Sequence, residues 1–289
     1  MNGDLYTTIE RQGHITVITQ MTKANKRCRA KRISKDEYVN LSTGEICEYE
    51  RHGETRADNK KSLLRSFAKI RGLVNANATN PRKVKFITLT YAENMRDPKR
   101  LYKDFKAFWQ RLLYWHKKHG WKKPEYLIVI EPQQRGAFHG HLLLFYPTQA
   151  PFFPEGELEE VWKHGFVKIS KIEHVDNLGA YLSAYLSDIA VDADEDDPAA
   201  VEIDGKPKAI IKGGRLSLYP PSMNLYRCSR GLKRPQKRPA SQREVDAYRA
   251  EHSPSYALTR TLKDPQTGFE TTIHKEYYND LRETGDSVK

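Results

Sequence analysis

The sequence has no long apolar run: none of its segments approaches the eighteen uninterrupted apolar residues that a membrane-spanning helix needs. Its first residues do not form a basic start followed by an apolar stretch, so we expect a cytoplasmic protein without membrane partners. Cysteine is scarce, and Cys28, Cys47 and Cys228 are odd in number and widely spaced. A disulfide framework and a paired-cysteine zinc site are therefore not expected. A phosphate-cradling Gly-x-x-x-x-Gly-Lys-Ser/Thr loop is also missing, which argues against a fused helicase.

Positive charge, by contrast, is in excess. Among 289 residues, 49 Lys and Arg face 37 Asp and Glu, which gives a formal net charge of +12. Together with 10% aromatic residues, this balance favours a phosphate-backbone partner, although a merely basic, solvated enzyme surface has the same composition. The densest basic segments are Lys23–Arg32 and Lys212–Arg234. We expect them to contribute a salt-dependent share of any nucleic-acid affinity.

Hydrophobic periodicity predicts three consecutive parts of the chain: basic strands and a helix over 1–80, a principal domain over 81–235, and a helix and hairpin over 236–289. The principal domain contains an acidic loop at about 191–200. Its expected strands cover 84–90, 126–130, 138–146 and 165–170. Its expected helices start at Asp97-Pro98, at about 155 and at about 176. Strands and helices in this order indicate an α+β fold.

The expected strand 138–146 contains two histidines, His139 and His141, which lie two residues apart and so project from the same face. Glu131 ends the preceding expected strand, and the two strands are predicted to form an antiparallel hairpin. A register that pairs odd with odd residues places Glu131 on the face of the histidines. Two imidazoles and a carboxylate suit one Mg²⁺ or Mn²⁺ ion with open positions for substrate, and would also accept Zn²⁺. The alternative is a glutamate that is simply exposed at a strand end.

The expected helix at about 176–189 carries two tyrosines, Tyr181 and Tyr185, one turn apart on the same face. Leu178, Leu182 and Leu186 form the adjoining apolar stripe. Tyrosines at this spacing are commonly a packing pair. A phenol is also a competent nucleophile when a metal ion withdraws charge from the phosphate that it attacks.

These segments together resemble the three ordered motifs of rolling-circle replication initiators. The resemblance rests on Phe86–Tyr91, on Glu131 with Arg135–His141, and on Tyr181-x-x-x-Tyr185, and it covers about residues 84–235. It is to HUH (His-hydrophobic-His) endonucleases of the plasmid and phage type with two tyrosines. Arg227–Lys233 resembles a segment that follows these motifs in bacterial members.

The resemblance implies an antiparallel five-stranded sheet flanked by helices, with small N- and C-terminal additions. It implies that Glu131, His139 and His141 hold one Mn²⁺ or Mg²⁺ ion. Tyr181 and Tyr185 would be the catalytic nucleophiles. The enzyme would nick single-stranded or hairpin origin DNA, form a 5′-phosphotyrosyl bond and release a 3′-hydroxyl as primer, with host helicase and polymerase as partners.

The chain departs from the family pattern at several positions. Gly140 replaces a bulky apolar residue between the histidines. Ala184 and Asp188 stand where the family often has lysines, which leaves Lys168 and Lys171 as unranked candidates for contacting the phosphate. Alternative functions are a transposase or relaxase, a DNA-binding protein whose tyrosines only stack on bases, and a metal hydrolase without a covalent step. Formation of a covalent protein–DNA adduct separates these classes.

Overall fold

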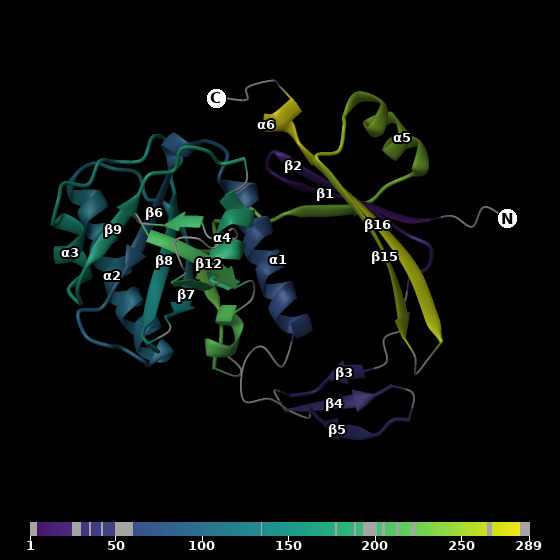
Figure 1. Ribbon diagram of the computed structural model, residues 1–289, viewed down its shortest axis with the longest axis horizontal. Coiled ribbons are helices and arrows are strands. Elements are labelled where there is room, and N and C mark those ends of the chain that lie inside the picture. Colours follow the sequence, from purple (N-terminus) through teal and green to yellow (C-terminus); the bar gives the residue numbers. More distant parts are fainter. Residues whose placement is uncertain are drawn as a thin grey trace. The chain divides into compact units, whose positions relative to one another are not determined.

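The computed structural model (Figure 1) describes residues 5–24, 30–34, 36–41, 43–49, 60–133, 135–176, 178–187, 189–192, 201–203, 206–211, 214–220, 223–264 and 268–283. The chain divides into two compact units. The terminal unit comprises residues 1–10, 16–53 and 237–289, and the central unit comprises 11–15 and 54–236. The expected acidic loop and the expected helix cap Asp58 fall largely or wholly outside the described residues.

The central unit is built on a five-stranded antiparallel sheet with the order β13-β7-β8-β6-β9. The α+β class and the five-stranded antiparallel sheet expected from the sequence are therefore confirmed. The middle strands are almost completely buried runs, as expected for the interior of a sheet. The strands are β6 (Val84–Leu89), β7 (Glu125–Pro132), β8 (Phe138–Phe145), β9 (Val167–Ser170) and β13 (Tyr226–Cys228).

One face of this sheet is covered by helix α2 (Pro98–Lys118). Asp97 caps the helix by accepting a hydrogen bond from the Lys99 backbone N–H at 2.8 Å, and Pro98 occupies the first turn, as predicted. Gly140 faces the helix, since a Cβ at this position would lie 3.7 Å from Leu101. His139 and His141 alternate with Gly140 along β8 and therefore project from the opposite face.

Helices α1 (Lys60–Asn77) and α4 (Leu178–Ser187) pack against each other within the central unit. Their approach is closest at Gly179, where a Cβ would lie 2.4 Å from the Asn75 side-chain oxygen and 2.9 Å from the Arg71 carbonyl. Only glycine fits between the two helices there. The short helix α3 (Glu157–Trp162) contacts α2 and β9, and the 3₁₀ helices are η2 (Pro81–Lys83) and η3 (Gly214–Leu218).

The two ends of the chain share a second five-stranded sheet, which the sequence did not predict. Its order is β14-β1-β2-β16-β15, so that the N-terminal hairpin and the C-terminal hairpin lie in one sheet instead of forming separate additions. Ser241 caps α5 (Gln242–Glu251), as expected, and α6 (Asp280–Glu283) follows the last strand. The strands are β1 (Tyr6–Gln12), β2 (Ile15–Met21), β14 (Gln236–Pro239), β15 (Tyr256–Asp264) and β16 (Phe269–Asn279).

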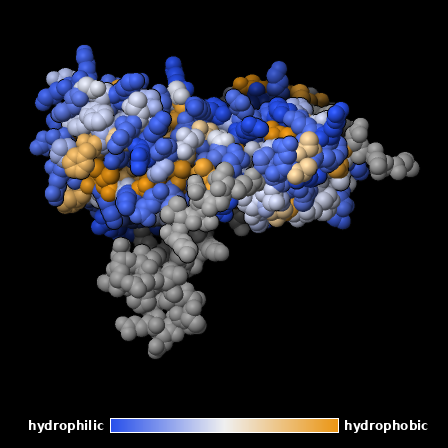
Figure 2. Space-filling model, turned by 90° about the horizontal axis from the view of Figure 1, so that it is seen from above, coloured by the Kyte–Doolittle hydropathy of each residue, from blue (hydrophilic) through white to orange (hydrophobic). Residues whose placement is uncertain are grey.

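Two small three-stranded sheets complete the described structure. The visible surface in Figure 2 is mostly hydrophilic, with small apolar patches between charged residues. Among the described residues, no helix combines the length and the apolarity that crossing a membrane requires. The small sheets consist of β3 (Ala30–Arg32), β4 (Glu37–Asn40) and β5 (Ile46–Glu48), and of β10 (Ile189–Asp192), β11 (Val201–Ile203) and β12 (Lys206–Ile211).

Candidate functional site

The hairpin of β7 and β8 brings the predicted carboxylate and imidazoles to one face of the sheet. Glu131 pairs directly with His139, and Val129 pairs with His141. The predicted odd-with-odd register is therefore confirmed. The loop between the strands closes through a 2.7 Å hydrogen bond from the Gln133 N–H to the Ala137 carbonyl.

Glu131 and His141 are deeply buried, with 4% and 1% of their surfaces exposed. His141 Nε2 is hydrogen-bonded directly to Glu131 Oε2. The other ring nitrogen, His141 Nδ1, lies 3.2 Å from Thr88 Oγ1 on the neighbouring strand β6. Thr88 thus fixes the orientation of the imidazole, in the manner of residues that support metal-binding histidines.

His139 differs from His141 in having a buried nitrogen without a partner. Its Nδ1 lies 3.3 Å from Gln133 Nε2, but within the described part of the chain Nε2 has no hydrogen-bond partner. Burial lowers the pKa of His139 to about 4 in spite of the nearby Glu131 charge. The imidazole is therefore neutral at neutral pH, which is the form in which histidine binds metal ions.

Arg215 is a site residue that the sequence reasoning missed. It lies in η3, forms an ion pair with Glu131 Oε1 and donates a 2.9 Å hydrogen bond to the Pro132 carbonyl. Burial opposes ionisation of Glu131, but the hydrogen bond and charge of His141 and the charge of Arg215 together hold the pKa of its carboxyl below the ordinary value. The only sequence signal was the position of Arg215 in the basic segment Lys212–Arg234.

The donor chemistry of Glu131, His139 and His141 fits a divalent ion, because His139 offers an unpaired nitrogen and Glu131 is ionised. The site is nevertheless not a formed cage. No group of three or more His, Cys, Asp or Glu side chains in the described ranges is arranged to hold a metal ion. Metal binding would replace the direct hydrogen bond between Glu131 and His141.

The tyrosine helix α4 packs through the predicted apolar stripe, of which Leu178 and Leu182 are buried. Tyr181, on another side of the helix, is 57% exposed. Tyr185 lies in the same helix, but its side chain is outside the described structure. Helix α4 contacts η3, the element that carries Arg215.

The register of the sheet also separates the two candidate lysines. Lys168 on β9 pairs with Thr88, which in turn pairs with His141, so that Lys168 lies in the row of His141 on the same face. Lys171 instead forms a 2.9 Å ion pair with Glu173. Lys168 is exposed, and no ion pair involves it among the described residues.

Comparison with known families gives one match: residues 84–190 match a family of replication-associated proteins, described as the ORF2 type. The matched segment runs from β6 to β10 and includes the three candidate ligands and both tyrosines. Arg215 and the terminal unit lie outside it. No curated protein and no solved structure matches the chain. The central unit is thus similar to replication-associated proteins, which supports a role in the initiation of replication.

Proposed function

We propose that the protein is a metal-dependent HUH endonuclease with two tyrosines that nicks and joins single-stranded DNA to initiate rolling-circle replication. One observation carries this proposal: Glu131 and two histidines share a sheet face within the segment that matches replication-associated proteins. The tyrosine helix α4 belongs to the same segment. This combination supports a nuclease more strongly than a histidine pair by itself, because ordered context is what gives a short motif its meaning.

Glu131, His139 and His141 would hold one Mn²⁺ or Mg²⁺ ion, which would supply Lewis-acid polarisation of the scissile phosphate. Tyr181 or Tyr185 attacks the phosphorus through its phenol oxygen and forms a phosphotyrosyl bond. The bond from phosphorus to the 3′ oxygen breaks, and this oxygen takes up a proton. The products are a 3′-hydroxyl, which primes synthesis, and a 5′ end joined to the protein.

The two tyrosines divide the reaction cycle between them. One holds the 5′ end made at initiation, and the other cleaves the regenerated junction at termination. Because the residues are one helical turn apart, a modest rotation of the helix or of the DNA brings either phenol to the same phosphate. The partners of such an enzyme are single-stranded or hairpin origin DNA together with host helicase and polymerase in the cytoplasm.

Lys168 and Arg215 are the cations that the geometry offers to this site. Lys168 lies on the face of the histidines and takes the place of the lysines missing at Ala184 and Asp188. Arg215 holds the carboxylate of Glu131 by an ion pair and so orients it. Preorganised charges of this kind stabilise the negative charge on a transferring phosphate.

The test is incubation of the protein with labelled single-stranded origin DNA and Mn²⁺, followed by a denaturing gel. We expect a labelled band at the mass of a protein–DNA adduct, and none when the metal is chelated. Cleavage without an adduct would instead indicate a metal hydrolase.

A second candidate function is that of a DNA-binding protein without catalysis. The observation that favours it is the pairing of Glu131 with both His141 and Arg215, which satisfies the carboxylate without a metal ion. In this function the network is a structural brace, and Tyr181 stacks on bases. Such a protein retains DNA in a native gel but forms no covalent adduct with any divalent ion.

A further inference from the structure

Helix α2 displays a stripe of lysines on its outer side, away from the sheet. The stripe follows helical spacing and extends for about 28 Å, at 1.5 Å per residue. All of its members are exposed, and none forms an ion pair with another described residue. The stripe consists of Lys99, Lys103, Lys106, Gln110, Tyr114, Lys117 and Lys118.

The sign pattern of this stripe is unlike that of an ordinary solvated helix face. Exposed helices normally place opposite charges four residues apart, whereas Lys99, Lys103 and Lys106 follow one another at spacings of four and three. Like charges at these spacings destabilise a helix. The acidic residue of the helix, Asp104, is engaged by Arg100 and by the hydroxyl of Tyr91. A polyanion along the stripe relieves the repulsion among the lysines.

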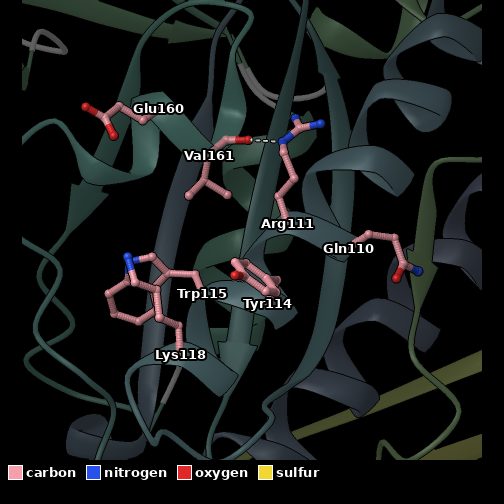
Figure 3. A pocket seen from close by; sticks show the side chains of 7 residues that line it. All are labelled: Gln110, Arg111, Tyr114, Trp115, Lys118, Glu160 and Val161. Carbon is pink, nitrogen blue, oxygen red and sulfur yellow. Dashed lines mark hydrogen bonds between the residues drawn. The ribbon is translucent and has the colours of Figure 1, made fainter.

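The C-terminal half of the stripe borders a groove of about 440 Å³ between α2 and α3 (Figure 3). Its walls are fixed in place. Arg111 donates to the carbonyls of Val161 and Trp162 at 2.6 and 3.0 Å, and Trp115 Nε1 donates to Glu157 at 2.7 Å. The ring of Tyr114 lies in the middle of this view, and its residue is 70% exposed. The groove is therefore a rigid pocket with an accessible aromatic face.

We propose that this surface is a second binding site for single-stranded DNA, with the phosphates along the lysines and one base stacked on Tyr114. The groove has the size of a small-molecule pocket, which is sufficient for a nucleobase. Glu160 lines it and repels phosphate, but its carboxylate accepts hydrogen bonds from the exocyclic amino group of a base. Because α2 covers the sheet face opposite the histidines, this site is separate from the candidate nuclease centre.

The phosphate contacts are tested by fluorescence anisotropy of an oligo(dC) probe in chelator, so that cleavage does not enter the measurement. Each phosphate contact contributes about 0.7 to the slope of log K against log salt for a single strand. The variant Lys103→Gln/Lys106→Gln should therefore lower the slope by about 1.4. The matched control Lys171→Gln/Lys263→Gln removes the same charge, but from lysines that already pair with Glu173 and Glu270. It should leave the slope unchanged.

The stacking contact is tested with Tyr114→Ala, which should weaken oligo(dC) binding about fivefold or more. Tyr256→Ala, which removes a tyrosine that is 60% exposed in the terminal unit, is the control and should bind as the wild type does. A duplex probe should not distinguish Tyr114→Ala from the wild type, because paired bases cannot stack on the ring. Equal slopes for the two lysine variants, or unchanged oligo(dC) affinity in Tyr114→Ala, would overturn the proposal whether or not the protein is a nuclease.

Discussion

The central and terminal units each contain a buried glutamate with a histidine and an arginine beside it. In the central unit, Glu131 is paired with His141 and Arg215. In the terminal unit, Glu276 lies 3.1 Å from His274 Nε2 and 3.0 Å from Arg249. The same three residue types therefore occur together twice, on two different five-stranded sheets.

The two clusters differ in how completely their polar atoms are satisfied. Glu276 also accepts a 2.9 Å hydrogen bond from the hydroxyl of Tyr278, and Arg249 donates at 2.7 Å to Gln20. None of these residues has a buried side-chain nitrogen or oxygen without a partner within the described chain, whereas His139 beside Glu131 has one. A Glu–His–Arg cluster is thus a stabilising network when it is complete. An orphaned imidazole nitrogen marks the cluster that has room for a ligand.

The surroundings of the clusters differ as well. The central sheet lies in a large apolar core that also includes α1 and α2. The core of the terminal unit is small and consists of Ile9, Ile18, Val245 and Tyr278, so its polar network contributes a larger share of its stability. Buried polar residues in the central unit are exceptions to an apolar interior, and such exceptions are expected at functional sites.

The strongest test of this difference is removal of the imidazoles. His139→Ala/His141→Ala should lower the rate of DNA cleavage about a thousandfold or more, since transition-state stabilisation of several kcal/mol is lost. Most of the DNA affinity should remain, because phosphate contacts dominate it. His274→Ala in the terminal unit is the matched control and should cleave normally. Wild-type cleavage rates for the double variant in Mn²⁺ would mean that the metal site is wrongly assigned.

Metal binding gives a second contrast, read out without activity. Mn²⁺ at about 100 times its Kd should stabilise the wild type by about 2.7 kcal/mol through linkage. Thermal unfolding of His274→Ala should shift in the same way, but that of His139→Ala/His141→Ala should not. If all three proteins respond equally to Mn²⁺, the ion binds elsewhere.

Loss of the complete network should affect stability and not chemistry. Glu276→Gln should lower the stability of the terminal sheet by about 2 kcal/mol, because hydrogen bonds to a charged group are replaced by weaker ones. Burial opposes ionisation of Glu276, but its bonds to Arg249, His274 and Tyr278 hold the pKa of its carboxyl below the ordinary value of 4.5. The stabilisation is therefore present above pH 4.5 and is lost as pH falls through the lowered pKa.

Hydrogen exchange of the β16 amides measures this effect. The difference between Glu276→Gln and the wild type should be largest near neutral pH and should shrink in acid. Cleavage rates should be equal at neutral pH. Unchanged exchange would contradict the structural role assigned to this network.

Local patterns predicted much of the central unit. The β7–β8 hairpin, its register and the start of α2 at Asp97-Pro98 follow from alternation, parity and capping, which depend on residues close in sequence. The pairing of Arg215 with Glu131 did not follow, because it joins residues far apart in the chain. The sheet shared by both termini was missed for the same reason, since long-range strand pairing leaves little trace in any local window.

The candidate lysines illustrate the boundary between the two kinds of information. The sequence offered Lys168 and Lys171 without a preference. Their order became visible only when the β6–β9 register aligned Lys168 with Thr88 and the ion pair with Glu173 engaged Lys171. The roles of Tyr181 and Tyr185 depend on chemistry that neither the sequence nor the geometry of α4 decides.

The central claim is that Tyr181 and Tyr185 are the nucleophiles, and the most direct test is to map the covalent adduct. The wild type is incubated with single-stranded origin DNA and Mn²⁺, digested with protease, and analysed by mass spectrometry. We expect phosphopeptides at Tyr181 or Tyr185, partial loss of activity in Tyr181→Phe and in Tyr185→Phe, and no adduct in the double variant. Removing a hydroxyl leaves each ring in place, so stability should change little. An adduct that maps to neither tyrosine, or that persists in the double variant, would contradict the mechanism.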